Sequence, residues 1–349
     1  MLKGEYIITE EIMSKKKVCI LYTGGTIGMI PTENGFAPAP GTFAKELAAI
    51  RDLSSPRMPD WDLVEFDPLL DSSNITYKQW NQIAEAIESR YDDYDGFVVL
   101  HGTDTMAYSA SALSFMLEGL SKPVIFTGSQ IPLCELRSDG KDNLITSVLI
   151  AAEDVVHEVC LFFSNELLRG NRATKYSSDR LIAFKSPNYT ELAKAGIDMR
   201  YRKRAFLEAD PDQPLTVRYL KDTRLAVIKV FPGIKFELFT PIVNGMQGLI
   251  LETFGSGNIP NYDKALSDLI DEASRTGAVV VVCTQCPQGS VRLGTYEAGS
   301  ALVNAGAVSG YNMTTEAAVA KLQYLLSQDL TREQVGELME TDLRGELDR

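Results

Sequence analysis

The chain has 349 residues, of which 45% are hydrophobic and 23% charged, so it can bury a sizeable core and is long enough for two domains. Its formal net charge of −13 disfavours binding to nucleic acid or to a membrane surface, because an acidic protein repels phosphate groups. No apolar stretch approaches the roughly eighteen residues that a membrane-spanning helix needs.

Residues 1–16 are expected to form an extension before the first strand. Residues 1–12 carry three glutamates and no long apolar core, unlike a secretory signal, and Met13 could be an alternative start. The five cysteines are scattered and odd in number, which favours free thiols and a cytoplasmic location over a disulfide framework. Cys283 and Cys286 match C-x-x-C, but no second pair completes a zinc site.

Four short apolar runs are each followed by a cluster of Thr, Ser, Gly or Asn and, in the expected pattern, by a helical segment. Short continuous apolar runs of this kind are typical of strands buried on both faces. Their alternation with helical patterns predicts a parallel sheet, whose ligands bind beyond the carboxyl ends of the strands. We therefore expect the clusters to meet at one edge. The runs and their clusters are 18–22 with 23–26, 97–100 with 101–105, 124–126 with 127–130, and 159–163 with 164–166.

Helices are predicted between these strands and again in a second α/β pattern. Thr76 and Gln79 form a capping-box signature ahead of one helix, and Thr331 and Gln334 do so ahead of the last one. The Pro- and Asp-rich segment 205–217 reads as a connector. We predict a two-domain α/β protein: a larger N-terminal domain with a mostly parallel sheet flanked by helices, and a smaller C-terminal α/β domain. The predicted parts are the extension 1–16, a catalytic domain 17–204, a linker 205–222 and a C-terminal domain 223–349.

Histidine and metal chemistry are not favoured. The sequence has only two histidines, His101 and His157, and no metal-ligand spacing such as H-E-x-x-H. His101 ends a buried run, where a hydrogen-bonded core residue is more common than a catalytic base. We expect no metal and no cofactor.

Hydroxyls, a carboxylate and a lysine remain as candidates. Thr26 follows two glycines at a strand end, and Gly25 there lets backbone N–H groups face an oxyanion. A threonine is a poor nucleophile unless a base or proton relay activates it. Thr103, Asp104 and Lys175 would form such a relay if they meet in space, which their spacing alone does not show. The Gly-Gly-Thr sequence is equally typical of a tight turn.

The glycines do not match a nucleotide-binding motif. Residues 24–28 lack the G-x-G-x-x-G spacing, and no Walker A sequence occurs. The Gly- and Pro-rich stretch 29–41 predicts a mobile loop, either an active-site lid or an ordinary connector.

Four segments together resemble the bacterial-type L-asparaginase family, most closely its cytosolic type I branch. They are residues 23–28, 71–73, 101–106 and 170–175, and the resemblance runs from about residue 17 to the end of the sequence. It implies hydrolysis of asparagine to aspartate and ammonia, a larger and a smaller α/β domain, and a homodimer or homotetramer with active sites near a subunit interface.

The resemblance also implies residue roles. Thr26 would be the nucleophile of a β-aspartyl enzyme, and the Thr103, Asp104 and Lys175 set would relay its proton. Asp71 and Ser72 or Ser73 would hold the α-amino and α-carboxylate groups of the substrate, and Asp104 would also face the amino group. Backbone N–H groups near Gly25, and near Gly102 or Thr103, would stabilise the oxyanion.

Two positions depart from the family. Phe36 stands where the family usually has a lid tyrosine, so activation would come from Tyr22 or Lys175, or the enzyme would be slower. Cytosolic members can carry a regulatory asparagine site that resembles an arginine-dependent pocket, and Thr174 and Cys286 match positions of it, but Glu252 stands in the corresponding segment 250–253. A glutamate repels a carboxylate, so regulation by asparagine is not expected.

Two other functions remain open from the sequence. One is a glutamine-hydrolysing subunit of a tRNA-dependent amidotransferase, against which the acidic charge and the short N-terminal extension count. The other is a non-catalytic amino-acid-binding or nucleotide-binding module, for which Phe36 is the only support.

Overall fold

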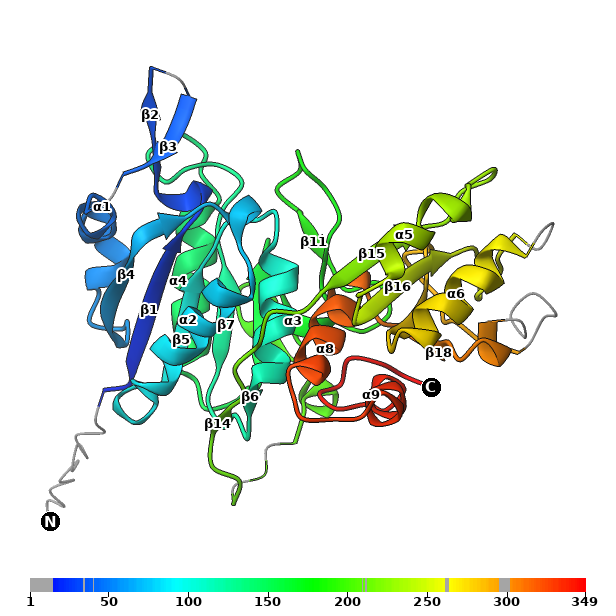
Figure 1. Cartoon of the computed structure of the whole chain (residues 1–349). Coiled ribbons are helices and arrows are strands. Elements are labelled where there is room, and N and C mark those ends of the chain that lie inside the picture. The colour runs from blue at the N-terminus through cyan, green and yellow to red at the C-terminus, as the bar shows by residue number, and fades with distance from the viewer. Residues whose placement is uncertain are drawn as a thin grey trace, which may run out of the picture.

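The computed structural model describes residues 15–33, 35–39, 41–208, 210, 212–260, 264–294 and 302–349. The predicted extension, apart from residues 15 and 16, and the alternative start at Met13 lie outside these residues. Two α/β units lie side by side, each built on its own sheet (Figure 1). This arrangement confirms the predicted two-part α/β architecture.

The larger sheet has eight strands in the order β13-β12-β9-β8-β7-β5-β1-β4. Neighbouring strands from β4 to β8 pair in parallel, and the remaining three pair antiparallel at the other edge. The mostly parallel sheet is thus as predicted. The strands are β1 (Lys17–Gly24), β4 (Asp60–Leu70), β5 (Gly96–Leu100), β7 (Val124–Thr127), β8 (Val159–Phe163), β9 (Glu166–Arg169), β12 (Ala193–Ala195) and β13 (Met199–Tyr201).

Successive residues of β1 point to opposite faces of the sheet, and each face has its own core. Cys19 and Leu21 pack in a cluster with helices α2 (Tyr77–Glu88) and α3 (Met106–Met116). Val18 and Ile20 pack instead with α1 (Phe43–Ala49) and α4 (Gly140–Ala152). Because both faces are covered, the strand reads as a continuous apolar run.

The fourth predicted cluster does not lead into a helix. Ser164 and Asn165 have φ values of 48° and 68°, and they turn the chain directly from β8 into the antiparallel strand β9. Asn adopts this left-handed conformation more readily than most residues, so the polar pair serves a tight hairpin. The expectation of a strand-to-helix connection at this place was wrong.

The segment after Thr26 is a hairpin rather than a loop. Strands β2 (Met29–Thr32) and β3 (Gly35–Pro38) pair antiparallel and project beyond the large sheet (Figure 1). Gly35 has a φ of 109°, a conformation open chiefly to glycine, at the start of the second strand.

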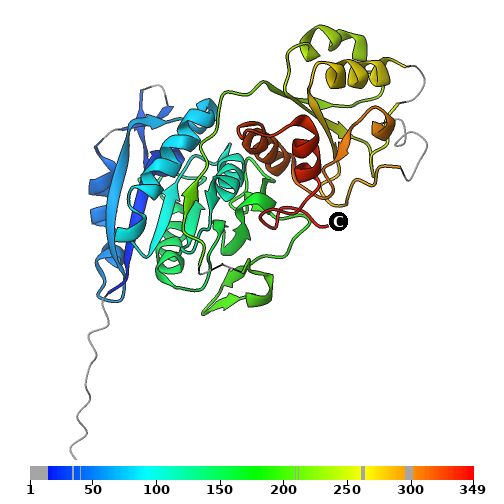
Figure 2. The same ribbon diagram turned by 60° about the horizontal axis from the view of Figure 1, so that its bottom comes forward.

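The smaller sheet is parallel, in the order β15-β16-β17-β18. Helix α8 joins it to the larger unit, because its buried face shares one core cluster with α3. Figure 2 shows α8 and α9, in red, between the two sheets. Both predicted capping boxes, at Thr76 and Thr331, are present. The elements are β15 (Leu225–Lys229), α5 (Thr240–Val243), β16 (Gly248–Thr253), α6 (Ala265–Arg275), β17 (Val279–Thr284), β18 (Val308–Ser309), α8 (Thr315–Leu326) and α9 (Arg332–Met339).

Two pairs of short strands complete the fold. Strands β10 (Thr174–Lys175) and β11 (Phe184–Lys185) pair antiparallel beside the large sheet. Strand β14 (Thr216–Val217), in the predicted linker, pairs with β6 (Leu117–Glu118) at the end of α3. Among the helices that the structure describes, none combines the length and the apolar composition needed to cross a membrane.

Candidate active site

The ends of β1, β4 and β5 border one cavity of about 230 Å³ at the carboxyl edge of the large sheet. All four predicted catalytic residues line it, together with most of the predicted substrate-binding residues. The first three polar clusters therefore converge as expected for a parallel sheet. The lining residues are Gly25, Thr26, Met29, Asp71, Ser72, Gly102, Thr103, Asp104, Gln130, Lys175 and Ser178.

Glycines allow the three strand ends to touch. Gly25 has a φ of 89°, and a Cβ atom there would lie 2.5 Å from the Cα of Gly102. A Cβ atom on Gly102 would in turn lie 2.5 Å from the Oγ of Ser72. A side chain at either glycine would push the strand ends apart, so the backbone groups of all three segments can face one small ligand.

Thr26 opens the short 3-10 helix η1 (Thr26–Gly28) directly after Gly25. Its side chain is partly exposed to the cavity, and no hydrogen bond joins its hydroxyl to another residue in the described part of the chain. The hydroxyl is thus available to a ligand that enters the cavity.

The three residues of the predicted relay are in contact. Lys175 Nζ donates to Thr103 Oγ1 over 2.9 Å and to Asp104 Oδ1 over 2.6 Å. Thr103 is 6% exposed, whereas the side chain of Asp104 is 68% exposed. The lysine is therefore fixed between a buried hydroxyl and a solvent-facing carboxylate, an arrangement that can pass a proton between a nucleophile and a leaving group.

Gln130 contacts the relay, a role that sequence reasoning missed. Its Oε1 accepts the hydroxyl hydrogen of Thr103 over 3.1 Å. Its Nε2 donates to the carbonyls of Ser178 and Arg180, and its backbone N–H donates to Asp139. The third polar cluster contained this residue at a strand end, which was the available signal.

Asp71 and Ser72 face the cavity, but Ser73 does not line it. Asp71 caps the 3-10 helix η3 (Ser72–Asn74), and its carboxylate accepts from the Ser73 backbone N–H over 3.0 Å and from the Ser73 hydroxyl over 2.8 Å. The carbonyl of Ser72 accepts from the hydroxyl of Thr105. Ser73 therefore orients Asp71, and of the two serines only Ser72 lines the cavity.

His101 is buried next to the site and supports its backbone. Its Nδ1 lies 2.7 Å from the carbonyl of Gly102, which can only accept, so Nδ1 carries the proton. Its Nε2 then accepts from Ser109 Oγ, which accepts from Trp80 Nε1. Burial lowers the pKa of His101 to about 4, so the ring is neutral at pH 7. It fixes the Gly102 peptide and cannot act as an exposed base.

Neither Phe36 nor Tyr22, the aromatic alternative for activation, lines the cavity. Phe36 is 48% exposed on β3. Tyr22 is fully buried, stacks on Phe43 at 3.9 Å, and its hydroxyl lies under Gly28 with no hydrogen-bond partner among the described residues. Burial raises the pKa of Tyr22. Lys175 is the remaining candidate for activating Thr26.

A second cavity of about 230 Å³ contains the predicted regulatory residues Thr174, Glu252 and Cys286. The hydroxyl of Thr174 donates to Glu316 over 2.6 Å, and burial raises the pKa of Glu316. Lys175 borders both cavities, whereas its neighbour Thr174 borders only the second. The second cavity is thus lined by two carboxylates.

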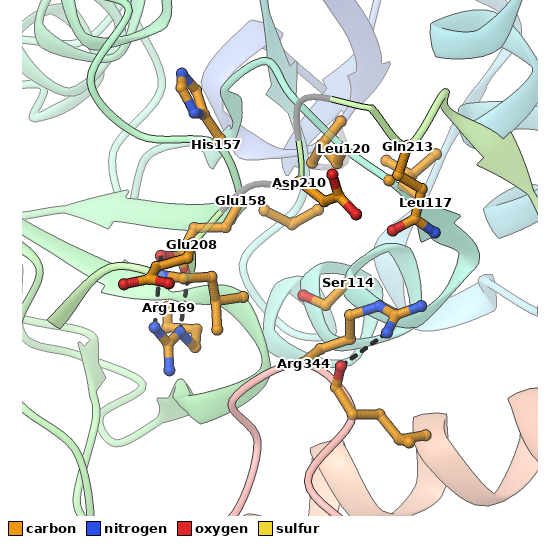
Figure 3. A pocket seen from close by; sticks show the side chains of 14 residues that line it. Ser114, Leu117, Leu120, His157, Glu158, Arg169, Glu208, Asp210, Gln213 and Arg344 are labelled. Atoms are coloured by element: carbon orange, nitrogen blue, oxygen red, sulfur yellow. Dashed lines mark hydrogen bonds and ion pairs between the residues drawn. The ribbon is translucent and has the colours of Figure 1, made fainter.

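A third cavity of about 180 Å³ lies near the start of β8, away from the catalytic edge (Figure 3). Arg169 at its wall pairs with Glu158 over 2.6 Å, and Arg344 donates to the carbonyl of Leu343 over 2.7 Å. These guanidinium groups are engaged within the protein rather than directed to a ligand.

Comparison with known proteins identifies the family. Residues 17–207 match the family model "Asparaginase, N-terminal", and residues 224–339 match "Glutaminase/Asparaginase C-terminal domain". The chain therefore belongs to the asparaginase family.

Individual relatives agree with this assignment. The chain is 48% identical over 336 residues to L-asparaginase 1 of Escherichia coli, covering 96% of this chain and 99% of the relative. The crystal structure of L-asparaginase I from Vibrio cholerae superposes with a TM-score of 0.89 at 46% identity, covering 96% and 100% of the two chains. The thermostable L-asparaginase of Thermococcus kodakarensis gives a TM-score of 0.85 at 31% identity, covering 95% and 99%.

Proposed function

We propose that this chain hydrolyses L-asparagine to L-aspartate and ammonia, with Thr26 as the nucleophile. The observation that carries the proposal is the contact of Lys175 with Thr103 and Asp104 inside the cavity that Thr26 borders. Similarity to L-asparaginases over nearly the whole chain supports the same activity.

In the proposed reaction, the Thr26 oxygen attacks the side-chain amide carbon of asparagine. Its proton leaves through the Thr103–Lys175–Asp104 relay and is delivered to the amide nitrogen, so that the C–N bond breaks and ammonia departs. Backbone N–H groups near Gly25 stabilise the oxyanion that forms on the carbonyl oxygen. A water molecule then cleaves the β-aspartyl ester, which releases aspartate and restores the Thr26 hydroxyl.

The proposed substrate orientation follows from charge. Asp71 and Asp104 are carboxylates at the cavity wall, and they match the positive α-amino group of an amino acid. The hydroxyl of Ser72 is positioned to donate to the α-carboxylate. The β2–β3 hairpin is the proposed lid, and Phe36 on it provides no hydroxyl, so we expect Lys175 to activate Thr26 without help from the lid.

We also propose that the enzyme works in the cytoplasm as a homodimer or homotetramer. All five cysteines are free thiols, which suits a reducing compartment, and the resemblance to type I asparaginases carries the oligomeric state. Sedimentation equilibrium across a range of concentrations tests the assembly, and a monomer at every concentration would contradict it.

The deciding experiment measures ammonia release from asparagine and from glutamine over a range of concentrations. We expect turnover of asparagine and its loss in Thr26→Ala, with the circular dichroism spectrum unchanged. Full activity in Thr26→Ala would rule out this nucleophile. Preference for glutamine together with co-purification of a second subunit would favour the amidotransferase alternative, and asparagine binding without turnover would establish a binding module.

A further inference from the structure

The segment that precedes Lys175 in the sequence is hydrogen-bonded to the tail segment, residues 342–349. Arg172, three residues before the lysine, donates from Nε to the carbonyl of Gly345 over 2.6 Å. Arg169 donates from Nη1 to the same carbonyl over 3.2 Å. Figure 2 shows the red tail lying against the green strands of the larger unit. Two buried guanidinium groups thus converge on one peptide of the tail.

Every nitrogen of the Arg172 side chain has a partner. Its Nη1 donates to Asn312 Oδ1 over 3.1 Å, and its Nη2 pairs with Asp348 at 3.2 Å. The guanidinium carbon lies 5.0 Å from the ring centre of Tyr189, and the whole residue is only 2% exposed. Because a planar guanidinium fixes all these directions at once, the position of Arg172 is set by the tail and by the residues around it.

The tail itself is anchored to α8. The carboxylate of Glu346 accepts two backbone N–H groups of the tail and pairs with Lys321 of α8, and both side chains are fully buried. Gly345 has a φ of 71°, and a Cβ atom there would lie 2.7 Å from the guanidinium carbon of Arg169. The tail therefore presents its carbonyl to the two arginines in one defined conformation.

The link from Arg172 to the relay is short. Ala173 is completely buried, and Thr174 donates to Glu316, also on α8, over 2.6 Å. The next residue is Lys175, with its contacts to the relay. Only Ala173 and Thr174 therefore separate Arg172 from Lys175, and both are held in place by burial or by a hydrogen bond.

We propose that Arg172 is a positioning residue of the relay, through which the tail segment sets where Lys175 Nζ lies relative to Thr103 and Asp104. The inference rests on the proposed function. Arg172 is not among the residues that line the catalytic cavity, so it acts only through the lysine. A displacement of the ammonium group by about 1 Å would disrupt the 2.9 Å and 2.6 Å contacts and lower the rate by up to about 100-fold.

The test compares two variants with a matched control. Arg172→Lys removes the planar group, and Asp348→Ala removes its exposed partner, which also accepts from Asn312 Nδ2. Asp329→Ala is the control, because Asp329 is also an exposed carboxylate paired with a cation, Lys221, at 3.3 Å. Competent sites are counted by calorimetric titration with aspartate. Per site, we expect kcat to fall about 10-fold or more in Arg172→Lys and about threefold in Asp348→Ala, with KM within about twofold of the parent. The pH profile of kcat should shift in both.

A purely structural role would lower the number of competent sites while kcat per site and its pH profile stayed parental, and that result would overturn the proposal. If Arg172→Lys does not fold, Asp348→Ala decides by the same criteria. If the unaltered protein releases no ammonia, the proposed function fails first. The crystal structure of Asp348→Ala then tests the positioning alone, because an unmoved Lys175 would refute it.

Discussion

Lys175 and Thr103 lie 72 positions apart in the sequence, yet Nζ of the one donates to Oγ1 of the other over 2.9 Å. The lysine arrives on the two-residue strand β10, and the threonine follows the buried strand β5. Because the lysine also donates to Asp104, the contacts of the proposed relay are present before any substrate binds. Such preorganisation avoids reordering these groups during the reaction.

The first prediction concerns this lysine. Lys175→Met is expected to lower kcat by about 10²–10⁴-fold, because the proton path from Thr26 loses its central group. Stability should change little, since Asp104, the ion-pair partner, is largely exposed and can be hydrated. Lys185→Met, on the paired strand β11, is the control, and its ammonia release should be parental. Equal rates of ammonia release in the two variants would show that Lys175 takes no part in the mechanism.

The second prediction concerns backbone contact. Gly25→Ala is expected to cost about 1–3 kcal/mol of folding free energy from its φ of 89° alone, and more from the collision with Gly102. Gly233→Ala is a matched control, because Gly233 has a φ of 84° with no heavy atom within 4 Å of its Cβ position. Urea denaturation should therefore show a larger loss for Gly25→Ala, together with loss of ammonia release. Identical losses would mean that only backbone strain matters.

A third prediction follows from the contacts of Gln130. Gln130→Leu keeps a similar size but removes the acceptor of the Thr103 hydroxyl and the donor to Ser178 and Arg180. The Thr103 hydroxyl would then rotate more freely, and we expect kcat to fall about 10-fold. Gln130→Glu keeps the acceptor and should retain more activity than Gln130→Leu. Because both variants lack the amide N–H donors, the opposite order would show that the charge of Glu facing the carbonyls of Ser178 and Arg180 costs more activity than the lost acceptor.

The fourth prediction is a dependence of stability on pH. The pKa of buried His101 is lowered from 6.5 to about 4, so below pH 6.5 the unfolded chain takes up a proton that the folded protein does not. Stability is therefore complete above about pH 6.5 and falls as pH decreases toward 4, by at most about 3 kcal/mol from this residue. Urea denaturation at pH 7 and pH 4.5 measures the fall. His101→Gln should show a smaller fall than the parent, and an equal fall would assign the effect to other groups.

A fifth prediction addresses the second cavity. Glu252 and Glu316 face it, and Lys229 lies 3.9 Å from Glu252. Two carboxylates disfavour binding of the α-carboxylate of asparagine, so rates should follow hyperbolic saturation with a Hill coefficient near 1 (about 1.0–1.2). Sigmoidal rates in the parent would contradict this prediction, and a change of the Hill coefficient in Glu252→Gln would then place the bound asparagine in this cavity.

Sequence patterns predicted the sheet well, because strands buried on both faces leave continuous apolar runs such as residues 97–100. They could not show that Lys175 reaches Thr103, since no local pattern encodes a contact across 72 positions. The cluster at Ser164 was misread because the same small polar residues serve both helix starts and tight hairpins. Asn34-Gly35 was an overlooked hairpin signal in the segment predicted as a loop.

The contact between Gly25 and Gly102 also limits how this enzyme can be altered. Two bare backbones meet at the centre of the site, so no side chain there can be exchanged to suit a longer or differently charged amide. Changes in substrate selectivity must be sought at other lining residues, such as Met29 and Ser178. A mutant library aimed at glutamine should vary these positions and leave the glycines untouched.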